Sequence, residues 1–341
     1  MARRLATVER IAALAEIPGA DLILRARIRG WDVVVRRDEF AVGDDCVYFE
    51  IDSLLDVTDP RFAFLAPRGV RTDVDGRSGH VLRTAKLRGV YSQGLALPLA
   101  AFGELTGART GDDVTEALGV RVFEAPIPAE LSGAVRGLRP GWIPMTDEER
   151  IQNVPEMLAA HVAWQATEKV DGSSTSVYVD VEGIEGVCSR NLDLLPSDTS
   201  TQWNLARRLD LHGRLASAFA GRAAVVQGET FGEGVQGNPL RMRGHHFRAF
   251  TLRVDGSEVP RGSWPAELLE LSVPVHELAF PSSVDEALAQ ADRLDSRVTP
   301  GRRAEGVVWR AADVADVVTE VGPRRASFKV ISNGYLLKHD R

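Results

Sequence analysis

The chain has 341 residues and a formal net charge of −7. This length exceeds what one ordinary hydrophobic core organises, so we expect two domains. With 44% hydrophobic and 26% charged residues, the composition is typical of globular proteins and argues against a disordered chain. The negative net charge excludes a polycation, so any contact with nucleic acid must come from local patches.

Nothing in the sequence indicates a membrane protein or a disulfide-rich secreted one. No run of about 18 apolar residues occurs, and Glu9 and Glu16 interrupt the apolar residues near the N-terminus. Cys46 and Cys188 are the only cysteines, which is too few for a zinc site or a disulfide framework. We therefore expect a cytoplasmic protein without a membrane partner.

The first part of the chain predicts short β-strands. Segments rich in β-branched and aromatic residues, separated by glycine turns, cover residues 22–28, 31–37, 46–55 and 90–99. Residues 105–120 predict a turn followed by a short helix. Short strands with glycine turns and few long helices indicate a small barrel of the OB type over residues 1–125.

A basic segment lies inside this part. Between residues 61 and 90 there are seven Lys and Arg against two Asp, a local net charge of 7 − 2 = +5. Such a segment is either a nucleic-acid contact or a solvated loop with scattered arginines.

Proline and glycine accumulate over residues 126–145, where we place a linker, so that a second domain covers residues 146–341. Thr146 and Glu149 have the spacing of a capping box ahead of a helix, and Ser283 and Glu286 have the same spacing ahead of a helix over 282–294. Residues 201–221 predict another helix. Strands are expected at 163–170, 174–181, 223–229, 247–254, 305–311 and 325–332.

Charged and aromatic residues recur at the ends of these strands in a fixed order. A lone Lys-x-Asp-Gly is weak evidence, because it occurs by chance in chains of this length. Here it is followed by five further motifs: Lys169-Val-Asp171-Gly172, Ser189-Arg190-Asn191, Gly228-Glu229, Phe247-Arg-Ala-Phe250, Glu305-Gly306 and Phe328-Lys329. This order resembles the covalent nucleotidyltransferase superfamily of ATP-dependent DNA ligases, RNA ligases and mRNA capping enzymes, and it spans residues 169–329.

The resemblance implies roles that the chemistry of these residues supports. Lys169 would attack the α-phosphorus of ATP as a neutral amine, so its pKa must be lowered by burial or by positive charge from Lys329 and a metal ion. Asp171 and Glu305 would hold Mg²⁺ or Mn²⁺, partly through water. Glu229 would accept hydrogen bonds from the ribose, and Arg190 would contact the ribose or a phosphate.

The nucleobase end of the site is less determined. Thr167 and Glu168 precede the nucleophile, and in such families this position contacts the adenine edge. Phe247 and Phe250 face opposite sides of a strand, so only one of them can stack on adenine. We choose Phe247. The alternatives are that Glu229 is an exposed strand-end acid and that Phe247 belongs to the core.

Residues 232–237, GEGVQG, match a dinucleotide-binding pattern, but no helix is expected after them. They therefore predict only a flexible glycine loop beside Glu229.

Within the superfamily, the chain looks like an ATP-dependent RNA ligase of the Deinococcus type. The small barrel precedes the catalytic domain, whereas DNA ligases and capping enzymes place it afterwards, and residues 146–153 and 328–338 look like nick-sealing RNA ligases. The implied fold is α+β: an OB-like β-barrel followed by a nucleotidyltransferase (ATP-grasp-like ligase) domain of antiparallel sheets flanked by helices. The implied partner is RNA or an RNA-containing nicked duplex, and we expect a monomer.

The implied reaction joins 3′-OH and 5′-phosphate ends through a lysyl-AMP intermediate and an adenylylated 5′ end. One feature departs from the pattern: the last motif usually has two lysines one residue apart, and here Ile331 stands in the second place. Lys338 is too distant to replace it, and Arg324 or Arg325 could share its role. The alternatives are a DNA ligase, or a nucleic-acid-binding protein with an inactive domain, although the complete set of Lys169, Glu229, Glu305 and Lys329 argues against decay.

Overall fold

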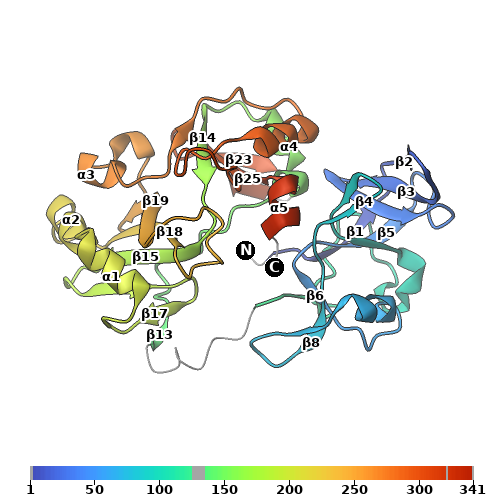
Figure 1. Cartoon of the computed structure of the whole chain (residues 1–341), viewed down its shortest axis with the longest axis horizontal. Helices are drawn as coiled ribbons and strands as arrows, with labels where there is room; N and C mark the ends of the chain where they lie inside the picture. Colours follow the sequence, from blue (N-terminus) through green and yellow to red (C-terminus); the bar gives the residue numbers. More distant parts are fainter. Residues whose placement is uncertain (1–2, 125–134, 320–321, 340–341) are drawn as a thin grey trace. The chain divides into compact units, whose positions relative to one another are not determined.

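The computed structural model describes residues 3–124, 135–319 and 322–339. The chain divides into two compact units, one formed by residues 1–128 with 336–341 and the other by residues 129–335 (Figure 1). Among the described residues, no helix has the length and apolar character needed to span a bilayer.

The first unit consists of short antiparallel strands. Three of them form a sheet in the order β1-β5-β11, and three consecutive ones form a meander in the order β2-β3-β4. A third sheet has the order β12-β6-β8-β7, and β9 pairs with β10. The bounds are β1 (Ala6–Arg10), β2 (Ala13–Ile17), β3 (Ala20–Ile28), β4 (Trp31–Arg36), β5 (Asp45–Phe49), β6 (Ser53–Leu55), β7 (Arg71–Thr72), β8 (Ser78–Val81), β9 (Ala85–Leu87), β10 (Val90–Ser92), β11 (Leu95–Pro98) and β12 (Arg121–Val122), with 3-10 helices η1 (Ala63–Arg68), η2 (Leu99–Ala101) and η3 (Gly103–Leu105).

Two segments expected as single strands are each divided in two. Residues 46–55 form β5 and β6, separated by a bend at Asp52, whose φ is 73°. Residues 90–99 form β10 and β11 on either side of Gly94, whose φ is 104°. A Cβ at Gly94 would lie 2.5 Å from the carbonyl oxygen of Phe49, so only glycine fits there. The short helix expected within 105–120 is absent: Asp113 forms an isolated β-bridge with Thr7, and residues 115–119 form a turn.

The basic segment of the first unit is largely solvent-accessible. Arg61 and Arg83 are partly buried, and Arg61 forms ion pairs with Asp59 and Glu104. The exposed cations of the segment are Arg68, Arg71, Arg77, Lys86 and Arg88.

The second unit contains two antiparallel sheets. The large sheet has seven strands in the order β13-β17-β16-β15-β18-β19-β20, and the small sheet has four in the order β21-β14-β22-β25. The strands are β13 (Val135–Leu138), β14 (Trp164–Lys169), β15 (Ser173–Val179), β16 (Glu185–Cys188), β17 (Leu192–Leu194), β18 (Ala224–Gly232), β19 (His245–Val254), β20 (Ser257–Glu258), β21 (Val275–His276), β22 (Gly306–Ala311) and β25 (Ser327–Ile331), with a separate hairpin of β23 (Asp316–Thr319) and β24 (Gly322–Arg325).

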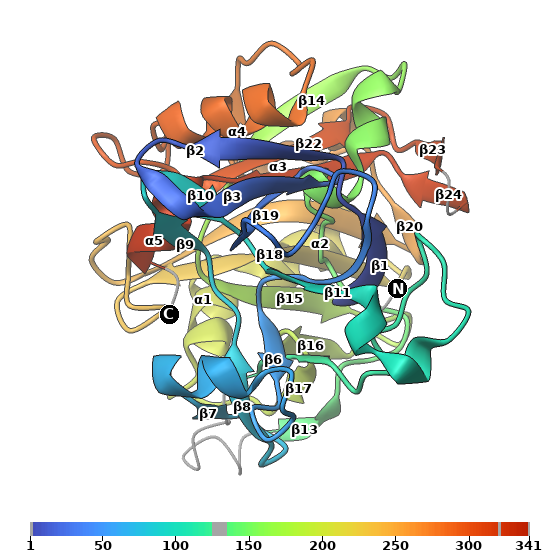
Figure 2. The ribbon, with the colours of Figure 1, turned by 90° about the vertical axis from the view of Figure 1, so that its right-hand side faces the viewer.

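Helices cover both sheets of this unit. On the large sheet, α1 (Thr201–Arg208) and α2 (Leu211–Ala218) bury Trp203, Leu211 and Leu215 against valines of β15, β16 and β18. On the small sheet, α4 (Val284–Arg293) packs Ala287 and Ala291 against Trp309 and Phe328, and Figure 2 shows it running alongside β22. The remaining helices are η5 (Ile151–Asn153), η6 (Pro155–Ala159), η7 (Arg261–Ser263), α3 (Ala266–Leu269) and α5 (Asn333–His339).

The helix expectations were correct in part. Ser283 caps α4, since its hydroxyl accepts a hydrogen bond from the backbone N–H of Glu286 at 3.1 Å. The helix expected over 201–221 is interrupted at Asp210, which adopts a left-handed conformation with φ of 50°. The helix expected after Thr146 is replaced by η5 and η6, because Pro155 lacks the N–H that an α-helix would need there.

The expected linker over 126–145 lies in part on residues 125–134, outside the described residues. Its later part contains β13, which pairs with β17 in the large sheet.

Candidate active site

A pocket of about 320 Å³ lies between the two sheets of the second unit. Its volume is within the range of small-molecule sites. The residues around it come from β14, β15, β18, β19, β22 and β25 and from the connecting loops. Of the predicted site residues, all except Glu305 and Phe247 line the pocket. Those that line it are Thr167, Glu168, Lys169, Asp171, Arg190, Glu229 and Lys329.

Glu305, one of those two, is the direct partner of Lys169. The Lys169 Nζ atom lies 2.7 Å from one carboxylate oxygen of Glu305 and 2.8 Å from the other. Strand pairing produces this contact, because Lys169 at the end of β14 is opposite Gly306 at the start of β22. A Cβ at Gly306 would lie 2.1 Å from the carbonyl oxygen of Val330, so the Glu-Gly motif needs its glycine for β22 to pair with β25.

The glycine of the Lys-x-Asp-Gly motif has a similar steric role. A Cβ at Gly172 would lie 2.2 Å from the carbonyl oxygen of Thr230 and 3.0 Å from Cγ of Glu229. Gly172 therefore lets the start of β15 lie against β18. This close approach brings Asp171 and Glu229 to the same pocket.

Negative charge dominates around the amine. Burial alone would lower the pKa of Lys169, but Glu305, Glu229 and Asp171 outweigh it and raise this pKa above its usual value. Burial also raises the pKa of Glu229 to about 8, with a further increase from Glu305 and Asp171 that the Lys169 charge opposes. In the protein alone, the burial that was expected to lower this pKa is thus outweighed by the neighbouring acids, so the lowering would have to come from the positive charge of a bound metal ion.

The segment after β25 contacts both acids that flank Lys169. The Tyr335 hydroxyl donates to Asp171 at 3.0 Å, and the backbone N–H of Ser332 donates to the carbonyl oxygen of Glu305 at 2.9 Å. The Ser332 hydroxyl in turn donates to Asp292 of α4 at 2.7 Å. These contacts hold Ser332 and Tyr335 beside the pocket.

Arg190 and Thr167 line the pocket while contacting protein groups. The Arg190 guanidinium pairs with Asp147 at 2.9 Å and is about half exposed. The Thr167 hydroxyl donates to the carbonyl oxygen of Val308 at 3.2 Å, across the β14–β22 ladder.

Glu168 differs from the expectation that its side chain reads the adenine edge. Its carboxylate is buried and accepts hydrogen bonds from the Ser296 hydroxyl at 2.5 Å and the Arg297 backbone N–H at 2.7 Å. His276 lies 3.2 Å from the same group. Successive side chains of a strand point to opposite faces, so Glu168 faces away from the side that carries Lys169. Only its backbone is left to face the pocket.

Phe247 is also placed differently from the expectation. Its side chain is buried in the core with α1 and α2, whereas Phe250 lines the pocket. The reason is a β-bulge: Gln227 is opposite Thr251 and Gly228 is opposite Ala249, so Phe250 is the extra residue of β19. The choice of Phe247 over Phe250 is therefore corrected.

Sequence reasoning missed several pocket residues. Glu148 precedes η5, Gln236 belongs to the glycine loop 232–237, and Arg310 lies on β22 five residues after Glu305. Of these, Gln236 lies in the loop that was expected beside Glu229, and Glu148 lies in the segment 146–153 that resembles nick-sealing RNA ligases, but neither residue was singled out.

The place of the missing second lysine is taken by Ile331, which lines the pocket. Of the residues suggested as substitutes, Arg325 forms ion pairs with Glu148 and Glu258, and Arg324 lies 4.0 Å from Glu149. Neither arginine is among the residues that line the pocket.

Asp171, Glu229 and Glu305 bring three carboxyl groups to one place beside the single amine of Lys169, which fits a divalent cation. Within the described part of the chain, however, no three His, Cys, Asp or Glu side chains are arranged to hold a metal ion by themselves. An ion here would take its other ligands from phosphate oxygens and water, as Mg²⁺ commonly does.

Comparison with solved structures identifies the family. A structure of Naegleria gruberi RNA ligase with pyrophosphate is 36% identical in sequence, covers 100% of both chains and superposes with a TM-score of 0.87. The chain belongs to the RNA ligase family. Mutant forms of the Naegleria RNA ligase solved with AMP and Mn (35% identity, TM-score 0.85, 99% of each chain) and with ATP and Mn (35% identity, TM-score 0.86, 98% of this chain and 99% of that one) match as well.

Family models support the same assignment for this RNA ligase. The model described as RNA ligase matches residues 162–331, and one described as OB-fold domain matches residues 5–99. Curated proteins gave no match. The expected α+β fold, with an OB-fold unit before a sheet-rich unit with helices, is confirmed, and so is the expectation of a ligase enzyme.

Proposed function

We propose that this RNA ligase is ATP-dependent and joins 3′-OH and 5′-phosphate ends at nicks in duplexes. The observation that carries the proposal is the Lys169 amine, which lies within 3 Å of the Glu305 carboxylate in a pocket that Glu229, Arg190 and Lys329 also line. Relatives solved with ATP, AMP and Mn support the choice of nucleotide and of metal.

In the first step, the Lys169 nitrogen attacks the α-phosphorus of ATP. A nitrogen–phosphorus bond forms, the bond to the bridging oxygen breaks, and pyrophosphate leaves with the electron pair. The ammonium must first lose a proton, and Glu305 is the carboxylate in contact with it. A divalent cation held by Asp171 and Glu305 would supply positive charge that favours the neutral amine and offsets the phosphoryl oxygens.

The other pocket residues would orient the nucleotide. Glu229 is suited to the ribose hydroxyls, and its raised pKa leaves it partly protonated near neutral pH, able to donate as well as accept. Arg190 and Lys329 offer cationic donors to phosphates. Phe250 replaces Phe247 as the proposed stacking surface for adenine, and the backbone at Thr167 and Glu168 is proposed to face the adenine edge.

In the second and third steps, AMP passes from Lys169 to a 5′-phosphate, and a 3′-OH then displaces AMP to form a phosphodiester. RNA would be held mainly through its phosphates, for which the exposed cations of residues 61–90 in the OB-fold unit are suited. The likeness to Deinococcus-type ligases, the preference for nicks and a monomeric state remain predictions from the sequence.

Two measurements test the proposal. Incubation with ATP labelled at the α-phosphate should label the protein covalently, whereas label at the γ-phosphate should not be retained. Nicked duplexes with a ribose or a deoxyribose at the 3′-OH end then test the substrate, and faster sealing of the ribose end is expected. Equal sealing of both would favour a DNA ligase, and absence of α-label would favour an inactive domain.

A further inference from the structure

The β-bulge in β19 changes the surroundings of Phe250 in two ways. It turns the ring toward the pocket, and it takes the residue out of the regular ladder with β18. A backbone carbonyl at such a position needs another donor. That donor is Arg310, whose Nη1 atom donates to the carbonyl oxygen of Phe250.

Arg310 also contacts the Phe250 ring. Its guanidinium carbon lies 5.6 Å from the ring centroid, within the range of a cation–π interaction. The same Nη1 atom lies 3.3 Å from the Thr251 hydroxyl. One side chain therefore holds the backbone, the ring and the next residue of the bulge.

This arginine belongs to the opposite sheet. It projects from β22, next to β14, which carries Lys169, whereas Phe250 belongs to the large sheet. Arg310 thus bridges the sheet that carries the proposed nucleophile and the sheet that carries the proposed stacking ring.

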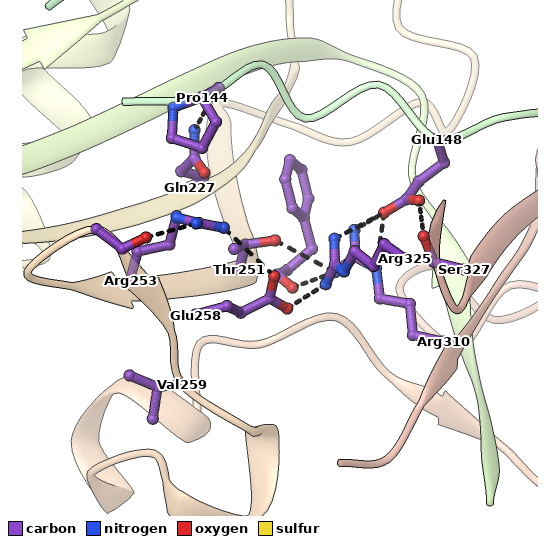
Figure 3. A network of polar contacts seen from close by, with 12 residues as sticks. Pro144, Glu148, Gln227, Thr251, Arg253, Glu258, Val259, Arg310, Arg325 and Ser327 are labelled. Atoms are coloured by element: carbon purple, nitrogen blue, oxygen red, sulfur yellow. Dashed lines mark hydrogen bonds and ion pairs between the residues drawn. The ribbon is translucent and has the colours of Figure 1, made fainter. Parts of the chain in front are cut away.

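A buried acid fixes the guanidinium in place. Arg310 Nε and Nη2 lie 2.9 and 2.7 Å from the same oxygen of Glu148. Burial alone would raise the pKa of Glu148, but Arg310 and Arg325 outweigh it and keep this pKa below its usual value. In Figure 3, Glu148 lies between the Ser327 hydroxyl and the two arginines, and Arg325 continues to Glu258 on β20.

We propose that Arg310 is a positioning residue for the nucleobase: it holds the Phe250 ring at a fixed separation from Lys169, so that stacked adenine presents its α-phosphate to the amine. This inference rests on the proposed function, because it takes Phe250 as the surface on which adenine stacks. It adds a residue that does not need to touch ATP to act on it.

Lysine cannot replace arginine in this role. The guanidinium is a planar fork with five N–H donors, which serves Glu148, the Phe250 carbonyl and Thr251 at once. A lysine at the same position would keep the positive charge beside Glu148. It would lose the hydrogen bonds to the Phe250 carbonyl and Thr251, so the bulge would be free to shift.

Arg310→Lys tests the proposal, with Arg253→Lys as the matched control on the same strand as Phe250. Arg253 contacts Glu258 and is not among the pocket residues. Binding of ATP and of inorganic tripolyphosphate is measured by calorimetry in a Lys169→Met background, and melting temperature reports folding. Arg310→Lys should weaken ATP about 10-fold, equivalent to about 1.4 kcal/mol, and leave tripolyphosphate binding unchanged. Arg253→Lys should change neither.

A merely structural network would weaken both ligands equally or lower only the melting temperature, and either result overturns the inference. A double-mutant cycle with Phe250→Leu provides a second readout. Strong non-additivity in ATP affinity is expected if Arg310 acts through the ring, and additive effects contradict it. Failure of the wild-type protein to form labelled lysyl-AMP would overturn the proposed function instead.

Discussion

The Lys169 amine contacts both carboxylate oxygens of Glu305, at 2.7 and 2.8 Å. In the protein without metal or nucleotide, this contact and the nearby Glu229 and Asp171 charges outweigh burial and raise the lysine pKa. The raised pKa favours the protonated form of Lys169. Attack by the neutral amine therefore requires that the negative charge around it be offset first.

Replacement of Glu305 by glutamine should lower the pKa of Lys169, because it removes the nearest negative charge. We expect a lower pKa than in the wild-type protein, because the Glu305 carboxylate is the largest of the interactions that raise it. The pH dependence of Lys169 modification by an amine-reactive reagent in EDTA, followed by peptide mass spectrometry, measures it. The exposed acid Glu267, changed to glutamine, is the control, and an unchanged or higher pKa in Glu305→Gln would contradict the account.

Stability should depend on Glu229 between pH 4.5 and about 8. The folded state raises the pKa of Glu229 from 4.5 to about 8, so the folded protein binds more protons than the unfolded chain across this interval. The contribution of Glu229 is fully present below pH 4.5 and is lost as pH rises through about 8. Urea titrations of the metal-free protein at several pH values should show this loss, and Glu229→Gln should flatten it. A wild-type curve that rises over the whole interval and is unaffected by the substitution would refute it.

Glu168→Gln should reduce stability rather than nucleotide selectivity. The buried carboxylate accepts hydrogen bonds from Ser296 and Arg297, and loss of such bonds to a buried charged group costs about 1–3 kcal/mol. The free energy of unfolding is measured by urea titration, and discrimination between ATP and GTP by competition in lysyl-AMP formation. Altered discrimination at full stability would show that the side chain reads the base after all.

Tyr335→Phe should raise the Mn²⁺ concentration that the enzyme needs for lysyl-AMP formation. The hydroxyl donates to Asp171, and loss of one hydrogen bond to a charged group costs about 1.5–3 kcal/mol. We expect weaker Mn²⁺ binding by direct titration and a higher Mn²⁺ concentration for half-maximal lysyl-AMP formation. Tyr178→Phe is matched, since Tyr178 donates to Asp193 away from the pocket. Equal Mn²⁺ affinities in the two variants would rule out a role for Tyr335 in holding Asp171.

Much of the fold could be predicted from local patterns. Runs of β-branched residues located β14, β15, β18, β19, β22 and β25, and the Ser283 cap located the start of α4. The sequence pattern does not reveal a bulge, which depends on how β19 pairs with β18, and so Phe250 was taken for the residue facing away. The break between α1 and α2 at Asp210 could not be predicted either. A residue other than glycine that adopts a left-handed conformation inside a helical pattern leaves no sign in the sequence.

The residues of the site also fall into those that could be predicted from the sequence and those that could not. The acids and lysines next to strand ends could be found because their motifs keep a fixed order along the chain. The direction in which the Glu168 side chain points could not be predicted, because its partners Ser296 and Arg297 are more than 120 residues away in the sequence. Arg310 and Glu148 were missed for the same reason: their pairing joins a loop to a strand 162 residues later.

The central claim is that the amine of Lys169 becomes covalently bonded to AMP. Peptide mass spectrometry after incubation with ATP and Mn²⁺ tests it directly, with Lys169→Ala and the exposed lysine variant Lys338→Ala treated in parallel. We predict that the peptide containing Lys169 gains the mass of one AMP, that Lys338→Ala is modified equally and that Lys169→Ala is not. An AMP adduct on another residue, or one that persists in Lys169→Ala, would contradict the account.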